Sequence, residues 1–192
     1  MLCRRDFLQM GVAGTLALLL PKPLFAQNNS ILLLYFSRSG NTRTIATMIA
    51  SKLHCTVQEL KPLKPYPENY DTVVELAKKE QKANARPQIA PPLPDIKPYD
   101  TIFVGYPNWW GTMPMLFFTL FESLDWTGKT IIPFCTHGGS GMGQSERDIK
   151  KLCPKASVQK GLAIYGTKVG QADKDVSAWL SQFGLTKAQG AL

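Results

Sequence analysis

Hydroxyl groups, a glycine and an asparagine gather in one short segment, Ser37-Arg38-Ser39-Gly40-Asn41-Thr42, which we call the first loop. These residue types suit an anion, because N–H groups and hydroxyls at the start of a helix readily converge on a phosphate. Gly40 would let the backbone approach that anion closely. Serine, asparagine and threonine are also common helix caps, so the segment alone leaves phosphate binding and ordinary capping equally open.

Two adjacent tryptophans mark a second loop, Tyr106-Pro107-Asn108-Trp109-Trp110-Gly111-Thr112. Large aromatic side chains in such a place either pack into the core or form a platform on which a flat ring stacks. With a phosphate site on a neighbouring strand, the platform is the better interpretation. A phosphate and a flat ring joined by a spacer describe flavin mononucleotide (FMN) or a similar nucleotide.

Four glycines distinguish a third loop, Thr136-His137-Gly138-Gly139-Ser140-Gly141-Met142-Gly143. Without side chains, they let the main chain approach the edge of a ligand and offer N–H groups to it. His137 could serve the ligand, as a hydrogen-bond donor or in proton transfer, or it could hydrogen-bond its own loop. The sequence leaves these roles equally open.

The elements that must position these loops alternate along the chain. Apolar runs predict strands at 31–36, 56–60, 101–105, 130–135 and 158–165, and helical spacing predicts helices at 43–53, 70–83, 114–124, 144–152 and 171–183. This alternation predicts an α/β fold with a doubly wound, five-stranded parallel sheet, order 2-1-3-4-5, and helices on both faces. Ligands of such sheets bind outside the carboxyl ends of the strands, where the three loops would meet.

The three loops together resemble those of the flavodoxin family, over about Ile31 to Gly166. The first loop looks like a flavodoxin phosphate loop, and Gly105–Gly111 and Phe134–Gly141 are similar to the two ring-binding loops of a bacterial flavodoxin-like family. The resemblance implies non-covalently bound FMN. It assigns the phosphate to Ser37, Ser39, Asn41 and Thr42, one side of the ring to Pro107, Asn108, Trp109 and Trp110, and another edge to Thr136–Ser140. The full predicted set is Ser37, Arg38, Ser39, Gly40, Asn41, Thr42, Tyr106, Pro107, Asn108, Trp109, Trp110, Gly111, Thr136, His137, Gly138, Gly139 and Ser140.

The function expected from this resemblance is electron transfer through FMN. Two alternatives remain: an FMN-dependent reductase that uses NAD(P)H and a quinone, and a non-redox module that binds a phosphate-bearing ligand. The chain departs from flavodoxins in charge, since they are usually acidic and this chain has a formal net charge of +8. An acidic redox partner would fit that charge. No dense basic run with interleaved aromatic residues is present, which argues against nucleic-acid binding.

Residues 1–26 have the layout of a secretory signal, with Arg4-Arg5 before an uncharged apolar stretch. The segment resembles a twin-arginine signal, which exports folded proteins. We therefore expect an exported, periplasmic protein whose mature part, 27–192, is one domain without a stable membrane span.

Other chemistries fit the sequence poorly. Gly128-Lys129-Thr130 would need a glycine at Ser123 to be a Walker loop, and Met142 stands where a nucleophile elbow requires glycine. Gly141 stands where a phosphatase loop built on Cys135 would need an arginine. Two histidines and cysteines without ligand spacing predict no metal site.

Overall fold

A parallel sheet organises the protein, and the computed structural model describes it within residues 31–185. Its strands are β1 (Ile31–Tyr35), β2 (Thr56–Glu59), β3 (Thr101–Pro107), β4 (Thr130–His137), β5 (Ser157–Val158) and β6 (Leu162–Tyr165). They follow the order β2-β1-β3-β4-β5, with β6 also paired to β4. The predicted fold class and strand order are therefore confirmed.

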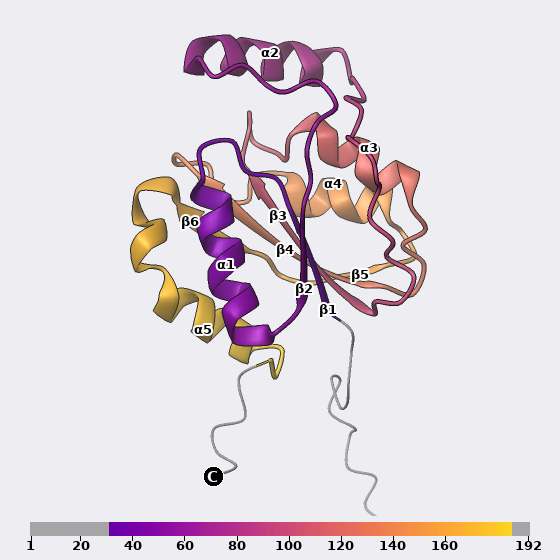
Figure 1. Cartoon of the computed structure of the whole chain (residues 1–192), viewed down its shortest axis with the longest axis vertical. Coiled ribbons are helices and arrows are strands. Elements are labelled where there is room, and N and C mark those ends of the chain that lie inside the picture. Colours follow the sequence, from indigo (N-terminus) through magenta and orange to yellow (C-terminus); the bar gives the residue numbers. More distant parts are fainter. Residues whose placement is uncertain (1–30, 186–192) are drawn as a thin grey trace, which may run out of the picture.

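Helices cover both faces of the sheet (Figure 1). They are α1 (Asn41–Leu53), α2 (Tyr70–Lys82), α3 (Met115–Ser123), α4 (Ser145–Leu152) and α5 (Asp173–Ser181), with a 3₁₀ turn, η1 (Gly166–Gln171), before α5. α1 and α5 pack on one face, and α3 and α4 pack on the other. α2 lies beyond the carboxyl ends of the strands, outside these layers (Figure 1).

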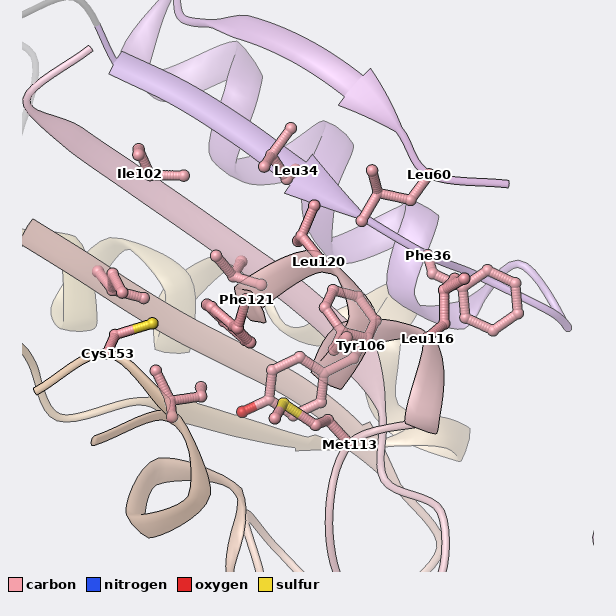
Figure 2. Packing of buried hydrophobic residues seen from close by; sticks show 14 of the residues in the cluster. Leu34, Phe36, Leu60, Ile102, Tyr106, Met113, Leu116, Leu120, Phe121 and Cys153 are labelled. Carbon is pink, nitrogen blue, oxygen red and sulfur yellow. The ribbon is translucent and has the colours of Figure 1, made fainter. Parts of the chain in front are cut away.

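Side chains along the central strands point alternately to the two faces of the sheet, which divides the core into two clusters. In β3, Ile102 and Val104 face α3, whereas Phe103 faces α1 and α5. Figure 2 shows the first cluster, in which Leu116 and Leu120 of α3 pack against residues of the sheet. Both faces of β3 are fully buried, which explains its continuous apolar sequence. Such a rigid centre fixes where each strand ends, and hence where the loops begin.

The predicted strand 158–165 is wrong in one respect, because it is interrupted. β5 pairs with the beginning of β4 and β6 pairs with its end, which leaves Pro133 of β4 between the two pairings. Proline has no N–H to donate to a ladder. A Cβ on Gly161 would lie 2.9 Å from the Pro133 carbonyl oxygen, so a glycine is needed where the chain passes this point.

Two element boundaries also change the description of the site. β3 and β4 continue two residues beyond their predicted ends, so Tyr106, Pro107, Thr136 and His137 belong to strands. The last helix begins at Asp173, because η1 occupies the preceding residues.

The predicted signal peptide, 1–26, lies outside the described residues, so export and the domain boundary at 27 stay predictions. Within 31–185, no helix is long and apolar enough to cross a bilayer.

Candidate cofactor site

The first loop connects β1 to the start of α1. Gly40 is the N-cap of α1 and has a φ of +90°, a left-handed conformation that favours glycine. A glycine cap has no side chain to satisfy the N–H groups behind it, and the first turn of α1 contains no acidic residue. The start of α1 therefore offers its N–H groups and its partial positive charge to an anion.

Ser37, just before this helix start, carries a buried hydroxyl. Its Oγ is shielded from solvent and has no hydrogen-bond partner among residues 31–185. Leaving a buried hydroxyl unpaired costs about 1–3 kcal/mol, so such an atom in a native protein requires an explanation. An oxygen of a ligand bound at the start of α1 would supply the missing partner.

A second buried hydroxyl ties the first loop to the third. Thr42 Oγ1 and Thr136 Oγ1 are 2.9 Å apart, and both residues are almost fully buried. Thr42 lies in the first turn of α1, whereas Thr136 lies near the end of β4. Their hydrogen bond joins two of the predicted residues at the carboxyl edge of the sheet, although 94 positions separate them in the chain.

Asn108 braces the second loop against the third. Its Oδ1 accepts a hydrogen bond from the Gly111 N–H at 3.0 Å, and its Nδ2 donates to the Gly141 carbonyl at 2.7 Å. The Gln144 N–H adds a bond to the Gly111 carbonyl at 2.7 Å. Because both ends of its amide are engaged, the Asn108 side chain fixes the distance between the two loops.

A cavity of about 300 Å³ opens where the three loops meet. Its lining combines these loops with one side of α2: Arg38, Tyr70, Val73, Val74, Ala77, Asn108, Trp109, Trp110 and Ser140. The contribution of α2 is the part of the site that the sequence prediction missed. The apolar spacing in 70–83 indicated an amphipathic helix, but it carried no information on what the apolar side covers.

The two tryptophans take different directions. Trp109 is half-buried, and its ring meets those of Phe36 and Tyr66 edge to face, at centroid distances of 5.7 and 4.9 Å. Trp110 is 46% exposed, and its Nε1 donates to the Val74 carbonyl of α2 at 2.9 Å. Trp109 is thus a supported wall of the cavity, whereas Trp110 connects the second loop to α2.

Tyr106 leaves only its main chain to a ligand at this edge. Its side chain is fully buried in the core, packs against Phe117 and donates to Ser145 Oγ at 2.8 Å (Figure 2 shows the tyrosine in its cluster). The alternation of Ile102, Val104 and Tyr106 along β3 gives all three the same direction. That alternation was the sequence signal for a core tyrosine.

His137 is held at the end of β4 by its own loop. Its Nδ1 accepts from the Gly139 N–H at 3.0 Å, and its ring centroid lies 4.4 Å from that of Tyr165. Burial lowers the pKa of His137 below its ordinary value. The neutral ring therefore carries its proton on Nε2, which leaves that nitrogen as a donor.

Lowering the pH should destabilise the protein through His137. Because its pKa is lower in the folded state, the unfolded state binds the proton more readily, and stability falls as the pH drops through about 6.5. We expect the Tm of the FMN-free protein to fall further between pH 7.5 and 5.5 than that of His137→Asn, whose Oδ1 can replace Nδ1 as the acceptor. Equal pH dependence of the two proteins would contradict this assignment.

The remaining predicted residues surround the same edge of the sheet. Four of them are exposed: Ser39, Gly138, Gly139 and Ser140. The other three are partly buried: Asn41, Pro107 and Gly111. In residues 31–185, no group of three or more His, Cys, Asp or Glu side chains could hold a metal ion.

Three loops around one cavity at the carboxyl edge of a parallel sheet define a doubly wound α/β protein with a ligand site at the end of its strands. The chain belongs to the flavodoxin family, because the family model described as Flavodoxin matches residues 30–183. No curated protein matches the sequence significantly.

Solved structures agree with this assignment. A proposed flavoprotein from Bacteroides eggerthii is 29% identical, with a TM-score of 0.70 over 83% of this chain and 100% of the other. A second, from Bacteroides uniformis, is 28% identical, with a TM-score of 0.69 over 81% and 99%. A flavoprotein from Lactobacillus acidophilus, solved in complex with FMN, is 22% identical, with a TM-score of 0.63 over 75% and 98%, and shares the fold.

Proposed function

We propose that this protein binds FMN non-covalently and transfers electrons through it. The observation that carries the proposal is the buried, unpaired hydroxyl of Ser37 before a helix start that has no side-chain cap. Arg38, the next residue, lines the cavity in which Trp109 forms one wall. An anion site beside an aromatic-walled cavity suits a phosphate joined to a flat ring, and the Lactobacillus acidophilus protein with this fold was solved with FMN.

Different residues of the chain would bind the phosphate and the ring of FMN. The phosphate would be held by the N–H groups at the start of α1 and by the hydroxyls of Ser37, Ser39 and Thr42. Trp109 would support the ring from one side of the cavity, and the apolar residues Val73 and Ala77 of α2 would exclude water from another.

Bound FMN would supply one- and two-electron redox chemistry. The protein would tune that chemistry through hydrogen-bond donors near the cavity, for which the Trp110 N–H and His137 Nε2 are candidates. The N–H groups of Asn108, Trp109, Gly111 and Thr112 are already bonded within the protein. A neutral His137 would donate a hydrogen bond without adding a charge.

The place and partners of this activity are proposed from the sequence. The twin-arginine resemblance of residues 1–26 favours delivery to the periplasm as a folded, FMN-loaded protein. The mature part, 27–192, keeps +6 of the formal charge of +8, which favours an acidic redox partner, since opposite charge steers encounter.

The first test is an absorption spectrum of the purified protein. We expect flavin bands in the blue and near-ultraviolet and release of FMN on denaturation. A colourless protein that also fails to bind added FMN would refute the proposal. With the flavin in place, oxidation of NADH or NADPH in the presence of a quinone would then separate a reductase from an electron carrier.

A further inference from the structure

α2 differs from the other helices in what its apolar side covers. α1, α3, α4 and α5 all contribute to the two core clusters on the faces of the sheet. Val73 and Ala77, the buried residues of α2, are members of neither described cluster and instead line the cavity. Figure 1 shows the helix in the corresponding place, across the carboxyl end of the sheet. α2 is therefore a wall of the site more than a part of the core.

Arg38 of the first loop holds the chain that leads into α2. Its Nε donates to the Pro67 carbonyl at 3.4 Å, and its Nη2 donates to the Glu68 carbonyl. Its guanidinium also lies 6.0 Å from the centre of the Tyr70 ring, at the first residue of the helix. One end of α2 is thus attached through a residue that lines the cavity.

Trp110 of the second loop holds the middle and the far end of α2. Its Nε1 donates to the Val74 carbonyl at 2.9 Å, and its own carbonyl accepts from Gln81 Nε2 at 3.2 Å. The Lys78 ammonium lies 4.7 Å from the centre of the Trp110 ring, which is a cation–π distance. One residue therefore contacts α2 at three successive turns.

The backbone of Trp110 adopts an unfavourable conformation in order to place its side chain against α2. Trp109 and Thr112 close a tight turn through two backbone hydrogen bonds, and the two residues between them have positive φ, +53° at Trp110 and +81° at Gly111. Turns of this kind prefer asparagine or glycine at both positions. A bulky aromatic residue is strained in this conformation, and the contacts of its side chain with α2 offset that strain.

The geometry points to Trp110 as the positioning residue that holds α2 closed over the cavity, which couples closure of α2 to binding of the cofactor. Closure itself follows from contacts within the chain, whereas the coupling rests on the FMN function proposed above. A ligand that binds only the closed form must stabilise α2, and a tighter α2 must favour the ligand by the same factor.

Hydrogen exchange of the backbone amides of 70–82 in the FMN-free protein tests whether Trp110 holds α2 in place. Trp110→Phe keeps a ring at the same φ but removes the N–H donor, so we expect exchange in α2 to be about three- to tenfold faster. Gln81→Ala removes the donor to the Trp110 carbonyl and should also speed exchange in α2, without substituting any residue of the second loop. The matched control is Trp179→Phe in α5, which removes an indole N–H bond to the Lys160 carbonyl and should leave α2 exchange unchanged. Unchanged α2 exchange in both Trp110→Phe and Gln81→Ala would overturn the assignment.

Adding FMN to the wild-type protein tests the coupling. At a free FMN concentration of about 100 times Kd, exchange in α2 should slow by roughly 100-fold if FMN binds only the closed form. Slow α2 exchange that FMN does not change, in a protein saturated with the flavin, would overturn the coupling. Failure to bind FMN at all would refute the proposed function and the coupling with it, whereas the FMN-free comparison would still decide the role of Trp110.

Discussion

Alanine in place of Gly143 is expected to weaken FMN binding by about 10- to 100-fold while the sheet stays folded. The third loop approaches the second so closely here that an added Cβ would lie 2.1 Å from the Gly111 carbonyl oxygen. Gly143 also has a φ of +56°, which an alanine adopts only with strain. The clash involves backbone, so the loops themselves must separate, and overpacking of this kind costs ~1–3 kcal/mol.

Flavin fluorescence titration would measure this loss, and far-ultraviolet circular dichroism would report on the sheet. Gly170→Ala is the control, because its Cβ would meet no atom within 4 Å and its φ is not positive. If Gly143→Ala binds FMN as tightly as Gly170→Ala, the spacing of the two loops does not determine the shape of the cofactor site.

Removal of the Ser37 hydroxyl should change stability and binding in opposite directions. In the FMN-free protein, Ser37→Ala eliminates a buried, unpaired polar atom and should raise stability by about 1 kcal/mol, or about 2–4 °C in Tm. FMN should bind about 10- to 100-fold more weakly, because hydrogen bonds to charged groups contribute ~1.5–3 kcal/mol. Riboflavin, which lacks the phosphate, should lose little affinity.

Ser145→Ala is the matched control for stability. Its hydroxyl is equally buried but has two partners, at 2.8 Å from the Tyr106 hydroxyl and 2.6 Å from the Met142 carbonyl. The same substitution there should destabilise the protein by about 1–3 kcal/mol, since it leaves a buried partner unsatisfied. Equal losses of FMN and riboflavin affinity in Ser37→Ala would rule out the phosphate role of this hydroxyl.

The sheet and its three loops could be predicted because their signals are local. Apolar runs of strand length alternate with helical spacing, and parallel strands end at one edge, so polar loops after β1, β3 and β4 must lie together. The meeting of Thr42 and Thr136 is a direct consequence of that geometry. The core direction of Tyr106 could also have been inferred, from its alternation with Val104 along the strand.

The position of α2 could not be predicted in the same way. Val73, Val74 and Ala77 give an apolar side whatever surface that side covers, and the choice between sheet and cavity depends on contacts made by Arg38 and Trp110 from distant loops. The break between β5 and β6 depends similarly on Pro133 of the neighbouring strand. In both cases the deciding residue lies outside the segment it affects, so the apolar pattern of the segment cannot indicate its influence.

The same break has a consequence for behaviour at high concentration. An uninterrupted outer strand would present a row of unpaired N–H and C=O groups, on which a strand from another molecule could add and start aggregation. Here one border of the described sheet consists of β5, with two residues, and β6, with four, and the opposite border is β2, also with four. Neither border is long enough to template an extended intermolecular sheet, so we expect the division of one strand to make the described sheet a poor starting point for aggregation.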